Sequence, residues 1–261
     1  MKRELNDILN DFQLINHKLE VELPYINIYP IGDLHIGSGD FNEESFRRWK
    51  DVVTKDPYGK IVIIGDMLDN GLKTSKTNSF EASMQPFQQK QWLTNELRPL
   101  ANKILGAVQG NHEYRSSIVA DMFPLYDVLA KLDLEDIYRQ NMAFMKINLG
   151  QRGAERQCSY TIVLAHGSSK AKTEKFSYAI DGMDVLINGH IHQPKTTFQS
   201  KIVIDSKNES VVLKDFMHIT VPSFQRMGGY ALRGMYMPQS SNMFPILRLG
   251  GTRKEMSVEW I

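Results

Sequence analysis

Short apolar runs bounded by turn residues alternate along the chain with stretches whose apolar residues are three or four apart. The first pattern is typical of buried strands and the second of amphipathic helices. Strands are expected at residues 27–31, 60–64, 103–108, 144–149, 160–165 and 183–188. Helices are expected at residues 1–20, 43–54, 80–100, 116–132 and 174–180. This alternation of strands and helices predicts an α/β fold.

From Lys195 onward the pattern becomes β-rich. Strand-like runs at 196–204, 210–221, 244–249 and 254–260 are separated by turn residues, and they predict a second sheet. Residues 222–245, which carry three glycines and the run QSSN, are expected to form a long irregular loop. A chain of 261 residues fits one large domain, and we expect a single domain over residues 1–261.

The composition is that of an ordinary soluble protein, with 42% apolar and 23% charged residues. Lys and Arg number 31 against 30 Asp and Glu, so the bulk basic excess of many dedicated nucleic-acid binders is missing. Any attraction to phosphate must therefore be local. The single cysteine, Cys158, excludes an internal disulfide and agrees with a reducing compartment. No apolar run approaches the roughly 20 residues that span a bilayer, so we expect a cytoplasmic protein without membrane association.

Five polar motifs follow apolar runs: GDLHIG at 32–37, GDMLDN at 65–70, GNHE at 110–113, AHG at 165–167 and GHIH at 189–192. The carboxyl ends of strands are where open α/β sheets bind ligands. Residues two apart on an extended segment point the same way, so one pair of side chains can bind one ion. The metal-compatible residues are Asp33, His35, Asp66, Asn111, His166, His190 and His192.

A single motif of this kind has ordinary explanations, such as an aspartate that caps the next helix. Five of them at successive strand ends indicate a site for two divalent metal ions. No cysteine takes part, which disfavours a structural zinc site, and these nitrogen and oxygen donors suit manganese, iron, zinc or nickel. Manganese is our first expectation.

In order and spacing, the motifs between Ile28 and Gln193 resemble those of the calcineurin-like metallophosphoesterases. That family's pattern is D-x-H, GD-x-x-D, GNH-[DE], H-G and GH-x-H. The resemblance implies a sandwich of two mixed β-sheets flanked by helices. It also implies hydrolysis of a phosphate ester by a metal-bound hydroxide.

The resemblance further implies a role for each motif residue. One metal would be held by Asp33, His35, Asp66 and His192, and the other by Asp66, Asn111, His166 and His190. His112 would be a catalytic histidine outside both metal shells, oriented by Asp69.

The run DLHIGS followed by Phe41 is similar to the archaeal DNA-polymerase small subunit and to bacterial SbcD-type nucleases. This favours a phosphodiesterase or nuclease that acts on DNA, RNA or nucleotides, of the small stand-alone type common in bacterial and phage genomes. Asn70 replaces the arginine of protein phosphatases, whereas Glu113 replaces the aspartate usual in nucleases. A phosphomonoesterase acting on small molecules or proteins, and a non-catalytic accessory subunit of a DNA-processing complex, stay open as alternatives.

Basic residues that follow the motifs are candidates for substrate binding. Arg115 is the strongest, because a guanidinium matches phosphate geometry, and Lys170 and Lys172 come next. Loop lysines are commonly just solvated. Tyr230 and Tyr236 could stack on a base, although packing is the commoner role of such residues. The oligomeric state is not predicted.

Overall fold

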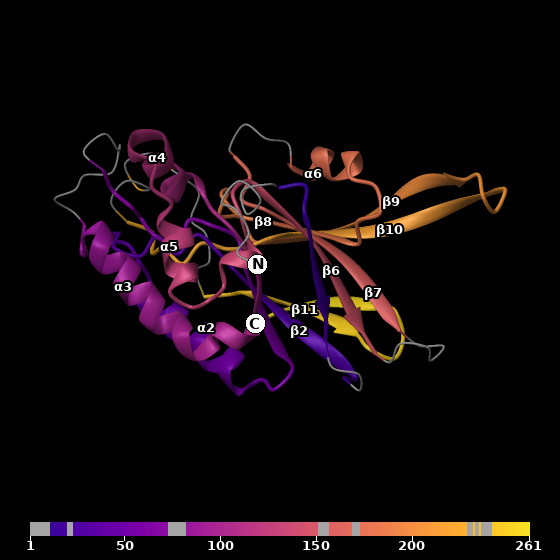
Figure 1. Ribbon diagram of the computed structural model, residues 1–261, viewed down its shortest axis with the longest axis horizontal. Coiled ribbons are helices and arrows are strands. Elements are labelled where there is room, and N and C mark those ends of the chain that lie inside the picture. The colour runs from indigo at the N-terminus through magenta and orange to yellow at the C-terminus, as the bar shows by residue number, and fades with distance from the viewer. Residues whose placement is uncertain are drawn as a thin grey trace.

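The computed structural model describes residues 11–19, 23–72, 82–150, 157–168, 173–228, 232, 235 and 242–261. These residues form two mixed β-sheets of six strands each, packed face to face (Figure 1). Helices cover the outer face of one sheet. This is the α/β sandwich that the sequence predicts.

The first sheet contains the central parallel strands and the C-terminal strands. Its order is β12 (Met256–Trp260), β11 (Pro245–Gly250), β2 (Tyr25–Ile31), β3 (Gly59–Ile63), β4 (Ile104–Val108) and β5 (Tyr138–Arg139). The second sheet has the order β1 (Leu14–Lys18), β6 (Met142–Leu149), β7 (Cys158–Ala165), β8 (Val185–Asn188), β10 (Ser210–Thr220) and β9 (Lys195–Asp205). The β-rich tail is therefore divided between the sheets, and the expectation that it forms a sheet of its own is wrong.

Helices connect the parallel strands. They are α2 (Glu43–Lys55), α3 (Pro86–Leu97) with the 3-10 helix η1 (Arg98–Lys103), α4 (Asn111–Ala120), α5 (Pro124–Ala130), η2 (Glu135–Ile137), α6 (Thr173–Phe176) and η3 (Ser177–Ala179). In α2, the side chain of Asn42 accepts a hydrogen bond from the amide of Ser45, which caps the helix. Phe46, Trp49 and Val53 follow at helical spacing and are fully buried against the sheet.

Two apolar cores enclose the central strands. One lies between the sheets and includes Ile28 and Val62, and the other lies under the helices and includes Ile31 and Trp49. Strands β2, β3 and β4 are covered on both faces, which explains why they are continuous apolar runs in the sequence. Their carboxyl ends are thus anchored between two apolar cores.

Two predicted helices are wrong in part. Within the predicted helix at 1–20, Leu14–Lys18 forms strand β1, which pairs in parallel with β6, and residues 1–10 lie outside the described residues. Only Ile15 of this strand is buried, and all five of its residues pair with β6, so pairing with a distant strand sets its conformation. The predicted helix at 116–132 starts earlier, at Asn111, and is interrupted at Asp121, whose φ of 51° is left-handed.

The hairpin of β9 and β10 projects beyond the rest of the molecule (Figure 1). Of the predicted loop at 222–245, the described residues before Pro245 belong to no strand of either sheet, and Gln225 makes an isolated bridge to Phe41. Among the described residues, no helix is both long and apolar enough to cross a bilayer.

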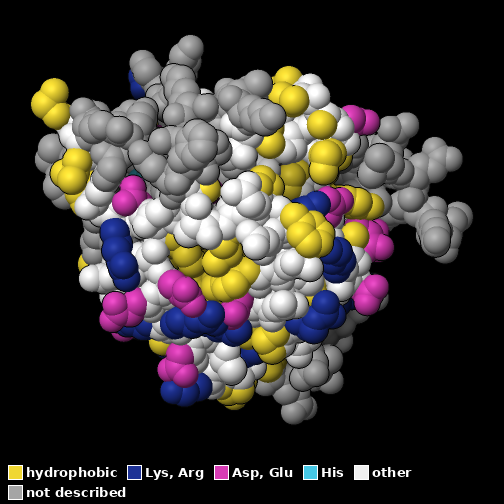
Figure 2. Space-filling model, turned by 90° about the vertical axis from the view of Figure 1, so that its left-hand side faces the viewer, with side chains coloured by type: hydrophobic (Ala, Val, Ile, Leu, Met, Phe, Trp, Pro, Cys, Tyr) yellow, Lys and Arg dark blue, Asp and Glu magenta, His cyan; other side chains and the backbone are white. Residues whose placement is uncertain are grey.

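Positive and negative side chains alternate on the helix-covered face (Figure 2). Ion pairs there join neighbouring helices, as between Lys50 and Glu96 at 2.6 Å and between Lys90 and Asp127 at 2.7 Å. Exposed pairs of this kind stabilise a fold little. They do neutralise one another, so the described residues of this face form no extended basic surface for a polyanion.

Candidate metal centre

All seven residues predicted as metal ligands lie together at one end of the sandwich. Each follows a strand: Asp33 and His35 come after β2, Asp66 after β3, Asn111 after β4, His166 after β7, and His190 and His192 after β8. The site therefore draws on both sheets. Packing of one sheet on the other fixes the distance between its two halves.

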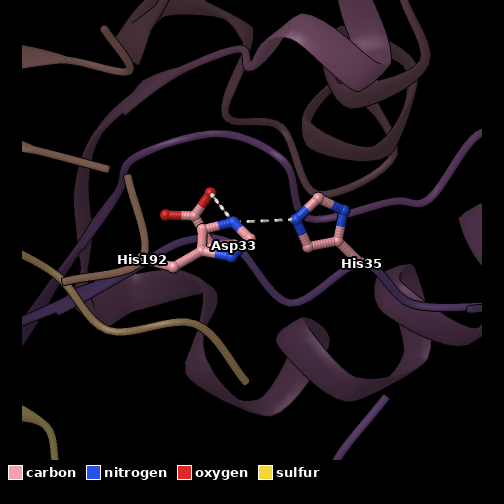
Figure 3. Close-up of side chains that lie close together, drawn as sticks. All are labelled: Asp33, His35 and His192. Atoms are coloured by element: carbon pink, nitrogen blue, oxygen red, sulfur yellow. Dashed lines mark hydrogen bonds and ion pairs between the residues drawn. The ribbon is translucent and has the colours of Figure 1, made fainter. Parts of the chain in front are cut away.

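The first group of donors is Asp33, His35 and His192 (Figure 3). The Nε2 atom of His192 lies 3.3 Å from the Oδ1 atom of Asp33 and 3.3 Å from the Nε2 atom of His35. Two ligand atoms bound to one ion at about 2.1 Å and at 90–109° are roughly 3.0–3.4 Å apart. The spacing of these three donors fits a shared divalent cation.

The second group is Asp66, His166 and His190, with Asn111 beside them. The Nε2 atom of His166 lies 3.2 Å from the Oδ2 atom of Asp66 and 3.1 Å from the Oδ1 atom of Asn111. The Nδ1 atom of His190 lies 2.7 Å from the same Asn111 oxygen and 3.3 Å from the Nε2 atom of His166. The three spacings of 3.1–3.3 Å also fit a divalent cation, whereas the 2.7 Å contact between His190 and Asn111 is that of a hydrogen bond.

Asp66 lies between the two groups. Its Oδ2 atom, which contacts His166, is also 3.9 Å from the Nε2 atom of His35 in the first group. The Oδ1 atom of Asp33 is fully buried and has no hydrogen-bond partner among the described residues. A buried carboxylate oxygen without a donor is costly, and a cation supplies the missing interaction.

Burial and the mutual interactions of the site shift several pKa values. Burial, followed by the charge of His112, holds the pKa of His35 well below its ordinary value, which favours the neutral imidazole that binds metals. Burial disfavours ionisation of Asp66, but the charge and hydrogen bond of His166 outweigh it and lower the pKa of Asp66. Burial likewise lowers the pKa of His166, but Asp66 outweighs it and raises that pKa to about 10. The carboxylate of Asp66 thus favours a positive charge beside it at the centre of the site.

His112 faces this centre from the first turn of α4. Its Nε2 atom is 3.9 Å from the Oδ2 atom of Asp66, and its Nδ1 atom is 2.8 Å from the carbonyl oxygen and 3.4 Å from the Oδ1 atom of Asp69. Burial lowers the pKa of His112, but the hydrogen bond with Asp69 and the charge of Asp66 outweigh it and raise that pKa. The imidazole is held at its Nδ1 side and directs Nε2 toward the donors. His35, Asp69 and His112 form a third group whose donor atoms lie close together.

The backbone is left-handed at five of the seven predicted ligands. The φ angles are 51° at Asp33, 49° at His35, 48° at Asp66, 70° at His190 and 57° at His192. Non-glycine residues adopt this region at a cost, and such residues cluster at functional sites. Each of these strand ends turns sharply, which directs the side chain back toward the common centre.

Two glycines allow the motif loops to approach each other. A Cβ atom on Gly110 would collide with the backbone and carboxylate of Asp66, and one on Gly189 would lie 2.6 Å from the Oδ2 atom of Asp33. The amide of His190 donates to that same oxygen at 2.9 Å. These glycines are therefore required for the carboxylates to pack against neighbouring backbone.

Glu113 has a structural role that sequence reasoning missed. It is fully buried, and its carboxylate accepts hydrogen bonds from the backbone amides of Asp66 at 3.0 Å, Leu68 at 2.9 Å and Gly110 at 2.9 Å. The bond to Gly110 joins the third residue of α4 to the amide of the residue that precedes the helix, a contact that the spacing from Gly110 to Glu113 could have indicated. Glu113 thus ties the loop after β3 to the start of α4.

Asn70, which occupies the position of an arginine in protein phosphatases, also binds α4. Its Nδ2 atom donates to the carbonyl oxygen of His112 at 2.7 Å and to the Oγ atom of Ser116 at 2.9 Å. The side chain of Asn70 is buried. This residue positions the helix that carries His112 and presents no charge to a substrate.

Of the residues predicted to bind substrate, the structure describes Arg115. Arg115 is half-buried on α4, close enough to His112 for its charge to lower the pKa of that histidine. The other candidates lie outside the described residues: Lys170, Lys172, Tyr230 and Tyr236.

A cavity of about 380 Å³ opens beside the second donor group. Its lining includes Asn111 and His166, the rings of Tyr114 and Phe176, and the amides of Gln140 and Asn141. Tyr114 is 42% exposed and Phe176 is 50% exposed, so both rings offer surface to a bound molecule. Pockets of this size accommodate small organic ligands.

Comparison with known proteins identifies one family. The sequence model of the family described as calcineurin-like phosphoesterase matches residues 26–194. No curated protein matches the sequence.

Two solved structures have a similar backbone trace. One is wild-type Vps29 complexed with Zn²⁺ from Entamoeba histolytica, with 13% identity, a TM-score of 0.41 and coverage of 90% of this chain and 98% of that chain. The other is a protein serine/threonine phosphatase from Saccharomyces cerevisiae with similarity to human phosphatase PP5, with 10% identity, a TM-score of 0.39 and coverage of 91% and 80%.

Proposed function

The chain belongs to the calcineurin-like phosphoesterase family, and from this we propose that it is a phosphodiesterase that hydrolyses nucleic acids or nucleotides with two divalent metal ions. Asp33, His35, Asp66 and His192 would hold one ion, and Asp66, Asn111, His166 and His190 the other. Manganese is the first candidate. The donor spacings of 3.3 Å in the first group and 3.1–3.3 Å around His166 in the second, together with the central place of Asp66, support this assignment.

Bound metals of this kind neutralise the charge of a phosphate ester and lower the pKa of a water molecule toward neutrality. The protein itself supplies the proton for the leaving group. His112 is suited to this role because its raised pKa favours the protonated ring, while Asp69 holds the Nδ1 side and leaves Nε2 directed at the site. Arg115, on the same helix, would contact the phosphate.

The cavity lined by Tyr114 and Phe176 is the observation that carries the preference for nucleic acid. It lies next to Asn111 and His166, so a substrate phosphate at the metals would place its attached group there. Aromatic rings stack on nucleobases, and a side-chain amide such as that of Gln140 hydrogen-bonds to base edges. A phosphoserine side chain would leave these rings unused.

The test is a substrate comparison on protein loaded with manganese. We expect faster cleavage of bis-p-nitrophenyl phosphate than of the monoester, together with cleavage of single-stranded DNA, double-stranded DNA or a cyclic nucleotide. Asp66→Asn should abolish all of these activities. A preference for the monoester would overturn the phosphodiesterase assignment, and failure to bind any transition metal would favour the accessory-subunit alternative.

The cavity has its own test. Tyr114→Ala should lower kcat/KM for a nucleic-acid or nucleotide substrate by about 10-fold, the usual value of one stacked base. The matched control is Tyr178→Ala, which removes a ring of similar exposure that packs on Phe216 instead of lining the cavity. Equal activity of the Tyr114→Ala and Tyr178→Ala proteins would exclude base stacking at the cavity.

A further inference from the structure

A short segment that joins the two sheets forms one wall of the cavity. Its residues Gln140, Asn141 and Met142 all line the cavity, and we call them the crossing segment. They lead from β5 in the first sheet into β6 in the second. Met142 pairs with Ala165, which directly precedes His166. The crossing segment therefore shapes the cavity where it meets the second donor group.

The carboxylate of Asp11 holds the crossing segment. Its Oδ1 atom accepts hydrogen bonds from the backbone amide of Asn141 at 3.0 Å and from that of Met142 at 3.4 Å. Its Oδ2 atom accepts a hydrogen bond from the Nδ2 atom of Asn141 at 2.6 Å. Hydrogen bonds to a carboxylate are stronger than those between neutral groups. One side chain thus fixes the backbone of two neighbouring residues and the side chain of one of them.

The pairing of β1 with β6 brings Asp11 to this place. Their parallel register, which pairs Leu14 with Phe144, aligns the start of β1 with the start of β6. The residues before β1 therefore lie beside the residues before β6. Phe12 is 91% exposed and Leu14 is 53% exposed. Residues 11–14 thus bury little apolar surface, but they supply a carboxylate to the cavity wall.

We propose that Asp11 is a positioning residue for the substrate cavity and keeps the crossing segment in the conformation that receives a nucleobase. This inference rests on the proposed function, in which the cavity binds the base. Without the carboxylate, the amides of Asn141 and Met142 bond to water and the segment gains conformational freedom. A bound base must then order the segment again. The expected result is a KM raised by about 10-fold, the scale of ordering one residue of backbone.

Amide hydrogen exchange measures the positioning itself and needs no substrate. Asp11→Ala should speed exchange at the amides of Asn141 and Met142 by about 10-fold, because it removes their acceptor. The matched control is Asn16→Ala, which removes the hydrogen bond that Asn148 donates to Asn16 at 3.1 Å, at the other end of β6. Equal exchange at Asn141 and Met142 in the two variants would overturn the proposal.

Steady-state kinetics test the effect on substrate binding. Thymidine 5′-p-nitrophenyl phosphate and methyl p-nitrophenyl phosphate release the same leaving group, and only the first carries a base. With manganese-loaded protein, Asp11→Ala should raise KM for the thymidine ester by about 10-fold and leave its kcat unchanged. Both constants for the methyl ester should stay unchanged. An unchanged KM for the thymidine ester, or a parallel loss with both esters, would overturn the role of Asp11.

A rescue experiment tests the contact between the two side chains. Asn141→Asp places a second carboxylate against that of Asp11 and should raise KM for the thymidine ester as Asp11→Ala does. The double change Asp11→Asn/Asn141→Asp restores one donor, one acceptor and one negative charge. It should return KM to within about 3-fold of the natural value. A double variant as impaired as Asn141→Asp alone would show that this contact does not position the segment.

Failure of the proposed function has a different signature. A natural protein that prefers the monoester would overturn the phosphodiesterase assignment, while faster exchange in Asp11→Ala would still support the positioning of the crossing segment. Equal KM values for the thymidine and methyl esters in the natural protein would overturn both the base-binding cavity and the role of Asp11 in it.

Discussion

Removing the Glu113 carboxylate should destabilise both the fold and the metal centre. Glu113→Ala leaves the buried amides of Asp66, Leu68 and Gly110 without their acceptor. Each unsatisfied buried donor costs about 1–3 kcal/mol. Some relaxation follows the change, so we expect a loss of about 4 kcal/mol in the free energy of unfolding. Metal binding should weaken in parallel, because one freed amide belongs to Asp66.

Glu113→Gln is a milder change that should remove one of the three hydrogen bonds instead of all three. The Oε2 atom of Glu113 accepts two of the three bonds and the Oε1 atom accepts one. A glutamine can keep its oxygen toward Asp66 and Gly110, but its NH₂ group then faces the amide of Leu68. One bond is lost, so the expected destabilisation is about 1–3 kcal/mol.

The assay is urea unfolding followed by circular dichroism, with metal content measured on the same samples. Glu259→Gln on β12 is the control, since that side chain is exposed and should change stability by less than about 0.5 kcal/mol. If Glu113→Ala unfolds like the control, the three hydrogen bonds do not stabilise the fold. If it is destabilised but binds metal normally, its assigned link to the site is wrong.

Three further predictions concern His112, metal loading and pH. His112→Ala should lower turnover by about 10²–10⁴-fold while metal content stays unchanged; loss of metal would show that His112 is itself a ligand. Manganese at 100 times its Kd should stabilise the native protein by about 2.7 kcal/mol, and Asp66→Asn should remove this increment in a thermal melt. Burial lowers the pKa of His17, which bonds to the carbonyl oxygen of Leu105. As the pH falls, the unfolded chain therefore takes up a proton on His17 before the folded protein does. The contribution of His17 to the free energy of unfolding is full above a pH of about 6.5 and is lost below it, with a slope of up to about 1.4 kcal/mol per pH unit. His17→Gln should flatten that part of the stability profile in urea titrations, and an unchanged profile would refute the role of His17.

The central strands could be predicted from the sequence because burial on both faces of a strand requires a continuous apolar run. Strands such as Ile104–Val108 are apolar at every position and end at a motif. The cluster of donors followed from the same logic, since strand ends on one edge of a sheet must meet. These parts of the fold depend on local patterns that a single segment carries.

Features that depend on distant segments could not be predicted in this way. Strand β1 exists because Leu14–Lys18 pairs with β6, which lies about half the chain away, and its own spacing is equally that of a helix. Which sheet each strand of the tail joins is likewise decided by the strand with which it pairs elsewhere in the chain. The role of Glu113 depends on amides from two separate loops that become neighbours only in the folded protein.

The left-handed backbone at Asp33, His35, Asp66, His190 and His192 has a consequence for how this sequence would respond to selection. Glycine adopts that conformation without strain, so replacing any one of the five by glycine relieves local backbone energy and removes a donor in the same step. A mutant library sorted only for the thermal stability of the metal-free protein should therefore accumulate glycine at these positions. A library sorted for turnover should reject it. The two screens would enrich opposite residues at the same five codons, and the difference between them would map the active centre.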